Sequence, residues 1–216
     1  MNKQPIINQK IIFLGIIWGI SEATLGYLIH LIPGINFLSG MIMFPIGFYM
    51  MVCGLKETNR ISSIIVVSGI AAGIKLFDFI FPLALPLRII NPSVAILLES
   101  TAVVVAMKLI DVKNHSFNLS YAYLISFAWR ILFLIFPSLP LVFISQGILL
   151  KPTPTILNFF VIEPIIEGFF IYLVYKFVKS HQFKISFKLN PRFSISVMLL
   201  AFYLSAKIVL SNFLPQ

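Results

Sequence analysis

The sequence has 216 residues, of which 59% are hydrophobic and only 11% are charged. A soluble domain has about 45–50% apolar and about 25% charged residues, so there are too few polar side chains here to cover a water-soluble globule. The formal net charge is +9, but the positions of the basic residues argue against nucleic acid as a partner. The composition predicts an all-α integral membrane helix bundle that forms a single transmembrane domain over residues 1–216.

Apolar runs long enough, or nearly long enough, to cross a bilayer recur along the chain, since a span needs about 20 residues. The first run is too long for the core of a signal peptide and no A-x-A-like cleavage site follows it, so we expect an uncleaved span. The second is short and contains Pro45, which predicts a tilted or partly re-entrant helix. We expect an interfacial piece at "LPLVFISQGILL" (139–150) and six or seven transmembrane helices, at 11–32, 40–55, 61–81, 93–110, 119–136, 155–177 and 193–213.

The lysines and arginines predict the orientation of these helices. If the N-terminus lies inside, only Arg88 and Lys151 fall in outer loops, and an excess of basic residues on the inner side is the usual bias of multi-pass proteins. We therefore expect a multi-pass protein of the cell membrane with its N-terminus inside and its inner face on anionic lipid. The basic residues on the inner side are Lys3, Lys10, Lys56, Arg60, Lys108, Lys113, Lys176, Lys179, Lys184, Lys188 and Arg192.

Five of the seven acidic residues lie within predicted spans, together with three basic ones. A charge at the centre of a membrane helix costs about 2.5–3.5 kcal/mol on insertion scales, so such residues are functional candidates. At 1.5 Å per residue they lie about 13–27 Å from the inner boundary of a core about 30 Å thick, mostly from the midplane outward. We expect them to share a ligand-binding cavity that opens outward, and the excess of acids favours a cationic or zwitterionic ligand. They are Glu22, Lys75, Asp78, Glu99, Arg130, Glu163, Glu167 and Lys207.

The stretch "FFVIEPIIEGFFIYL" (159–173) predicts one wall of this site. Glu163 and Glu167 are four residues apart and therefore project from one helix face. Pro164 has no N–H, which leaves the carbonyl of Phe160 without its helical partner and available to a ligand.

A structural role for the same charges stays open at this point, because they can pair with one another. The pairs that we consider are Lys75–Asp78, Arg130–Glu99 and Lys207–Glu163. Five acids outnumber three bases, so two carboxylates would remain to hold a proton or to meet a cation.

Other candidate residues carry weaker signals. His30, near the outer interface, is either a solvated histidine or a ligand, and Trp18 and Trp129 can line the cavity. Cys53, the single cysteine, has no partner for a disulfide and belongs to no zinc-binding pattern, so we expect it to be a small apolar residue. We predict no cofactor, and the sequence leaves a metal undecided.

Small residues four apart form a strip on the first predicted helix, at Gly15, Gly19 and Ala23. Such a strip lets another helix approach closely. The partner is either a helix of this chain or a second membrane protein that docks there. Gly69 and Gly73 repeat the spacing on the third predicted helix.

With this strip, and with "NPSVAILLE" leading into the span of Glu99, the chain resembles the substrate-binding S components of energy-coupling factor transporters. The resemblance implies a small helical membrane protein that binds a vitamin, a metal or a similar micronutrient in the outer half of its bundle. It also implies that Gly15, Gly19 and Ala23 dock a membrane coupling protein and that separate subunits supply the ATPase.

The function that we predict is that of a solute-binding transport component rather than an enzyme. The sequence has no nucleotide-binding loop, no HExxH and no GxSxG motif, so we expect partner subunits to supply the energy for transport. Two alternatives remain: an intramembrane enzyme that uses Glu163 and Glu167 as acid and base, and a non-catalytic membrane scaffold.

Overall fold

The structure, a computed structural model, describes residues 9–30, 38–80, 86–112, 116–138 and 152–181, with Ile195, residues 197–202 and Ala206 beyond them. All regular secondary structure in these residues is helical, which confirms the predicted all-α class. Most of the predicted last span (193–213) and the whole predicted interfacial piece (139–150) lie outside the described residues.

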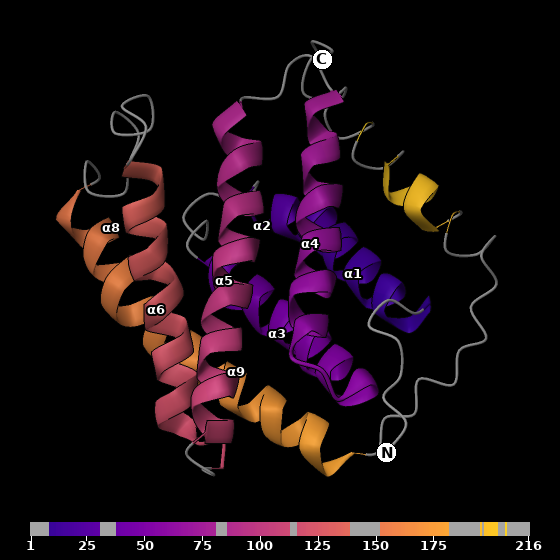
Figure 1. Cartoon of the computed structure of the whole chain (residues 1–216). Coiled ribbons are helices and arrows are strands. Elements are labelled where there is room, and N and C mark those ends of the chain that lie inside the picture. The colour runs from indigo at the N-terminus through magenta and orange to yellow at the C-terminus, as the bar shows by residue number, and fades with distance from the viewer. Residues whose placement is uncertain are drawn as a thin grey trace.

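The described chain folds into helical stretches that follow one another along the bundle (Figure 1). The first contains α1 (Gln9–Ser21), the π-helix η1 (Glu22–Gly26) and α2 (Tyr27–His30). The next three are α3 (Leu38–Thr58), α4 (Ser62–Leu76) with the 3₁₀ turn η2 (Phe77–Ile80), and α5 (Pro86–Val112). After α6 (Leu119–Ser138), the last contains α8 (Thr153–Leu157), the π-helix η4 (Asn158–Ile162) and α9 (Glu163–Ser180).

Three of these stretches are long and apolar enough to cross a membrane, namely Leu38–Thr58, Ile89–Asp111 and Thr153–Ser180. Ser62–Leu76 and Leu119–Ile135 are apolar but shorter. The second predicted span, expected to be short, is a continuous helix of 21 residues with Pro45 inside it. The fourth begins earlier than predicted, because the helix continues through Pro92. Both prolines keep a helical backbone and remove one hydrogen bond each rather than ending the helix.

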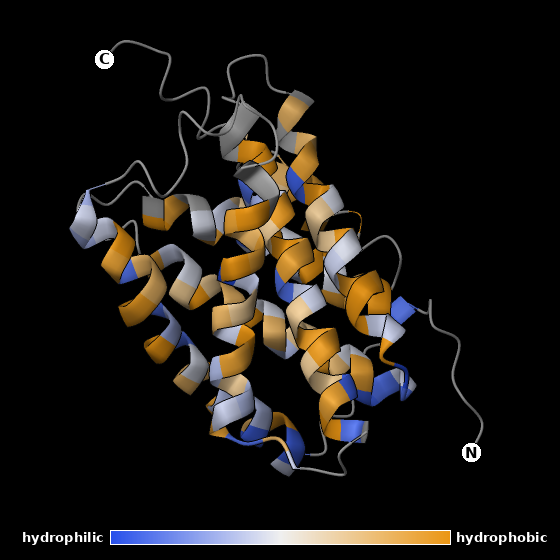
Figure 2. Cartoon of the chain, turned by 60° about the vertical axis from the view of Figure 1, so that its left-hand side comes forward, coloured by the Kyte–Doolittle hydropathy of each residue, from blue (hydrophilic) through white to orange (hydrophobic). Residues whose placement is uncertain are grey.

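The helix ends that carry basic residues gather at one end of the bundle. Lys10 at the start of α1 forms a 2.6 Å ion pair with Glu57 at the end of α3. Lys56 donates a 2.7 Å hydrogen bond to the carbonyl of Val178 near the end of α9. Consecutive stretches therefore alternate in direction (Figure 1), and Figure 2 shows hydrophilic helix ends at the bottom of the bundle. We call this the basic end; its described basic residues are Lys10, Lys56, Arg60, Lys108, Lys176 and Lys179.

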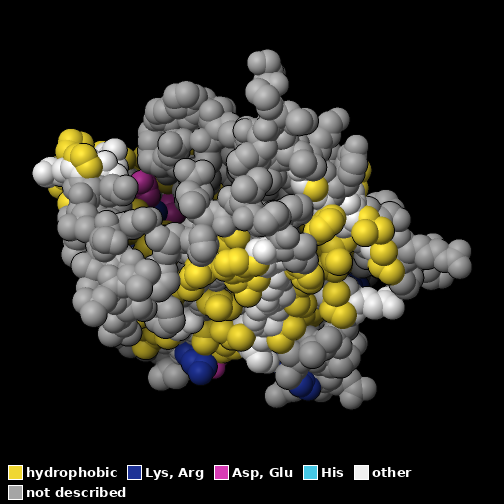
Figure 3. Space-filling model, turned by 90° about the horizontal axis from the view of Figure 1, so that it is seen from above, with side chains coloured by type: hydrophobic (Ala, Val, Ile, Leu, Met, Phe, Trp, Pro, Cys, Tyr) yellow, Lys and Arg dark blue, Asp and Glu magenta, His cyan; other side chains and the backbone are white. Residues whose placement is uncertain are grey.

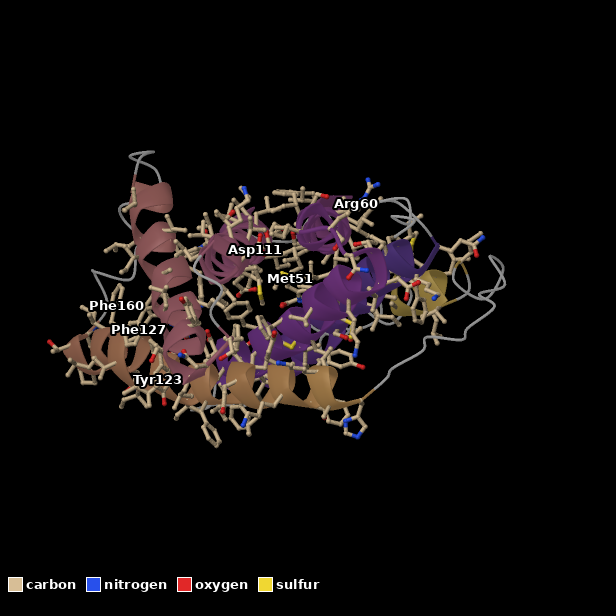
Figure 4. The ribbon with its side chains drawn as sticks, turned by 60° about the horizontal axis from the view of Figure 1, so that its bottom comes forward. Met51, Arg60, Asp111, Tyr123, Phe127 and Phe160 are labelled. Carbon is tan, nitrogen blue, oxygen red and sulfur yellow. The ribbon has the colours of Figure 1, made fainter. Side chains whose placement is uncertain are left out.

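The surface of the bundle is apolar where a soluble protein would be polar. Figure 3 shows hydrophobic side chains gathered over part of the face seen from above. Patches this large mark contact with lipid or with another protein. Inside, an apolar core includes Met51, which Figure 4 shows between the helices, with Arg60 toward the upper edge of the view. Exposed apolar side chains are found on α1, α4, α5, α6 and α9 and include Ile12, Ile65, Leu97, Val105, Ile131, Phe169 and Leu173.

The small-residue strip of α1 packs against the chain's own α4. A methyl group added at Gly15 would lie 2.7 Å from Cβ of Ile70, and one at Gly19 would lie 2.8 Å from Cβ of Ile74. These distances leave no room for a side chain, so α4 occupies the strip at both glycines. This corrects the expectation that Gly15 and Gly19 dock a partner protein; Ala23, in η1, is half-buried.

Candidate functional site

Six of the predicted site residues meet in the half of the bundle away from the basic end. The starts of α1 and α4 and the ends of α5 and α9 lie at the basic end. Glu22 and Lys75 are thirteen residues after those starts, and Glu99 and Glu167 are thirteen residues before those ends. At 1.5 Å per residue, all four therefore lie about 20 Å from the basic end along their helices. Five helical stretches thus contribute at one level. We call these residues the charge cluster: Glu22, Lys75, Glu99, Arg130, Glu163 and Glu167.

Arg130 of α6 forms the centre of one half of the charge cluster. Its side chain is fully buried. Nη1 donates to Oε1 of Glu167 at 2.9 Å and Nη2 donates to Oε2 at 2.7 Å, so α6 and α9 are joined by a two-pronged ion pair. This geometry matches the planar guanidinium to the carboxylate and is the strongest form of such a pair.

Two further donors on α6 complete the environment of Glu167. Oε1 accepts hydrogen bonds from Oγ of Ser126 at 2.7 Å and from Nε1 of Trp129 at 3.0 Å. Glu167 therefore accepts four hydrogen bonds, all from side chains of α6. Ser126 was not among the predicted site residues, although a serine four residues before Arg130 lies on the same helix face and was a usable signal.

Glu163 joins the same network one turn earlier on α9. Its Oε2 accepts a 3.3 Å hydrogen bond from Nη2 of Arg130. Both glutamates of "EPIIE" thus face one arginine, which confirms that they share a helix face. Next to Pro164 the helix widens rather than breaks, because the N–H of Glu163 donates to the carbonyl of Asn158, five residues back, at the end of η4. Single π turns of this kind are frequent at functional sites.

Aromatic rings enclose the guanidinium of Arg130. Its Cζ lies 4.5 Å from the ring centre of Trp129 and 5.3 Å from that of Phe159. Phe44 of α3 packs edge-on against Trp129, with the ring centres 6.1 Å apart. Low-dielectric walls strengthen the ion pair and exclude water from it.

Glu22 and Lys75 form another part of the charge cluster, between the first stretch and α4. Nε1 of Trp18 donates a 3.3 Å hydrogen bond to Oε1 of Glu22. The charge of Lys75, which is buried near the end of α4, acts favourably on the Glu22 carboxylate. Trp18 fits here because Gly47 of α3 has no side chain to meet its ring. Like Glu163, Glu22 adjoins a π turn, since η1 begins at this residue.

Glu99 of α5 lies between these two parts. It is only 5% exposed, and its Oε2 is buried with no hydrogen-bond partner within the described part of the chain. The charges of Glu22 and Glu167 repel its carboxylate, and that of Arg130 attracts it. Arg130 forms its ion pairs with Glu167 and Glu163 rather than with Glu99, so the pairing considered from sequence is wrong.

The remaining candidates fall outside what the structure describes. The side chains of Asp78 and His30 and the whole of Lys207 are not described, and neither are the pairs Lys75–Asp78 and Lys207–Glu163. Figure 3, which views the molecule from the side opposite the basic end, shows acidic side chains next to a basic one. Among the described residues, no group of three or more His, Cys, Asp or Glu residues is arranged to hold a metal ion.

Comparisons with known proteins leave the charge cluster as the main guide to function. No family model matches the chain, and neither a curated protein nor a solved structure is similar to it. The resemblance to S components therefore stays a prediction.

Proposed function

We propose that the protein is a multi-pass membrane protein that binds a small solute at the charge cluster and takes part in its transport. The observation that carries this proposal is the surplus of buried carboxylates. The described charge cluster holds four glutamates, three of them buried and Glu22 half-buried, against Lys75 and Arg130, and its acids come from three different helical stretches. An uncompensated charge is costly in a membrane helix unless it meets a partner or faces a water-filled cavity.

The surface and the interior support a membrane location together. Large apolar side chains lie on the outward faces of the helices, while the ionisable side chains of the charge cluster are turned inward. This is the reverse of a soluble protein, and it matches a bundle whose solvent is lipid. The gathering of lysines and arginines at the basic end supports a cytoplasmic position for that end, with the N-terminus inside and the charge cluster nearer the outer surface.

The contacts favour solute binding over the intramembrane enzyme considered from sequence. Glu163 and Glu167 would have to exchange protons with a substrate, but both accept hydrogen bonds from Arg130. Glu167 also accepts hydrogen bonds from Ser126 and Trp129. A general acid or base must reach the proton that it moves, and the four hydrogen bonds that Glu167 accepts already hold its carboxylate in a structural network.

Transport in this proposal depends on partner subunits. The predicted resemblance to S components suggests a membrane coupling protein and ATPase subunits as those partners. Since α4 fills the strip at Gly15 and Gly19, such a partner would contact another face of the bundle.

The test is mass spectrometry of the small molecules that the gently purified protein retains. We expect one class of solute to be enriched with the wild-type protein and lost from the double variant Glu22→Gln/Glu99→Gln. Glu57→Gln is the matched control, because it removes an acid from the basic end and leaves the charge cluster intact. A protein that is consistently empty, or solutes retained equally by all three proteins, would contradict the proposal.

A further inference from the structure

Within the charge cluster, the Glu167 carboxylate is fully hydrogen-bonded, whereas Oε2 of Glu99 has no hydrogen-bond partner among the described residues. This difference suggests the chemistry of the ligand. We propose that Glu99 binds the protonated primary amine of a cationic solute. This inference rests on the proposed function and adds the residue and the ligand class.

Glu167 and Glu99 are the same residue type at the same level, yet their surroundings differ. Glu167 accepts four hydrogen bonds, two of them from a guanidinium. Glu99 is almost as deeply buried, but its Oε2 accepts no hydrogen bond from any described residue. Buried polar atoms in folded proteins are nearly always paired, and an orphan such as this one requires an explanation. Glu167 holds the bundle together, whereas Glu99 keeps an acceptor available.

The charges around Glu99 favour a cation as the missing partner. Glu22 and Glu167 repel its carboxylate, and Arg130, the cation that acts on it, is already bound to Glu167 and Glu163. An arriving positive charge would interact favourably with all these acids. A ligand carboxylate would instead add a further negative charge, and both described cations of the charge cluster already act on glutamates. The ligand is therefore cationic rather than zwitterionic.

The form of the cation follows from what Glu99 lacks. Oε2 of Glu99 needs an N–H or O–H donor, and a primary ammonium group supplies three N–H donors together with a positive charge. A quaternary ammonium ion has none and is recognised by aromatic faces, but here Arg130 occupies the faces of Trp129 and Phe159. A metal ion would need several ligands, which the described residues do not assemble. A primary amine fits best.

The experiment measures thermal unfolding of the full chain, purified in detergent, in the presence of defined probes. Butylammonium is the test probe, tetramethylammonium lacks an N–H, and butyrate has the opposite charge. We expect butylammonium alone to raise the melting temperature, and Glu99→Gln to weaken its binding by about tenfold or more, the effect of losing one charge-assisted hydrogen bond. Glu57→Gln, at the basic end, should bind the probe as the wild type does. An equal shift in Glu99→Gln, or a preference for either other probe, would overturn the assignment.

A second measurement on the wild-type protein covers the case in which Glu99→Gln does not fold. A hydrophobic carbodiimide modifies buried carboxyl groups, and peptide mass spectrometry identifies the modified residue. We expect modification of Glu99, and protection of it by butylammonium but not by tetramethylammonium. No protection by butylammonium would overturn the inference. The solute-retention test separates this inference from the proposed function. If butylammonium gives no protection but a solute is still retained by the wild type and lost from Glu22→Gln/Glu99→Gln, only the amine assignment fails. If the wild type retains no solute at all, the proposed function fails as well.

Discussion

Removal of Arg130 should be the most damaging single change to the charge cluster. The guanidinium donates three hydrogen bonds to carboxylates, two to Glu167 at 2.9 and 2.7 Å and one to Glu163 at 3.3 Å, and its side chain is 0% exposed. Arg130→Met keeps most of the volume but leaves the Glu167 carboxylate buried without a counter-charge. Breaking a buried ion pair from one side costs about 3–5 kcal/mol, so we expect a loss of this size in the free energy of unfolding.

An ion pair at the basic end provides the comparison. Lys10 and Glu57 are closer, at 2.6 Å, but their side chains are 34% and 22% exposed. Exposed pairs contribute about 0–1 kcal/mol because water screens the attraction and the long side chains lose entropy. Lys10→Met should therefore cost less than about 1 kcal/mol, even though its ion pair is the shorter one.

The assay is reversible unfolding in detergent, followed by tryptophan fluorescence. Trp18 and Trp129 are both buried, so their emission reports the opening of the bundle. The double variant Arg130→Met/Glu167→Met removes both partners of the strongest pair and should be more stable than Arg130→Met alone, because no carboxylate of that pair remains unpaired. The reasoning would be refuted if Arg130→Met cost no more than Lys10→Met, or if the double variant were the less stable one.

Two further predictions concern packing and orientation. Gly15→Ala should separate α1 from α4 and lower the melting temperature, because the new methyl group would meet Ile70 at 2.7 Å. Gly69→Ala should leave the melting temperature unchanged or slightly raised, since nothing lies within 4 Å of the added carbon. Equal effects of the two variants would contradict the packing of α1 on α4. The orientation is tested in a background without the native Cys53. Asp111→Cys, at the basic end, should react with a membrane-impermeant thiol reagent only after cells are opened, whereas Thr153→Cys, at the start of α8, should react in intact cells. The reverse pattern would contradict the proposed orientation.

Local features of the charge cluster followed from the sequence because they depend only on helix geometry. Glu163 and Glu167 are four residues apart, and an α-helix places such residues on one face wherever it lies in the protein. The all-α class predicted from the sequence is confirmed in the described residues, and three helices there are long and apolar enough to cross a membrane. The proline between the two glutamates also marked an irregular helix, which is the π turn of η4.

Partners across helices were decided by the tertiary structure alone. The sequence contains two strips of identical spacing, yet Gly15 packs on α4 while Gly69 faces open space. Arg130 similarly had more than one carboxylate within plausible reach, and it pairs with Glu167 rather than Glu99. In a bundle of apolar helices, hydrophobicity does not distinguish a face that meets lipid from one that meets protein. Helix rotation, set by close packing and by these few polar contacts, determined that the Glu167 carboxylate is fully hydrogen-bonded while Oε2 of Glu99 has no partner among the described residues.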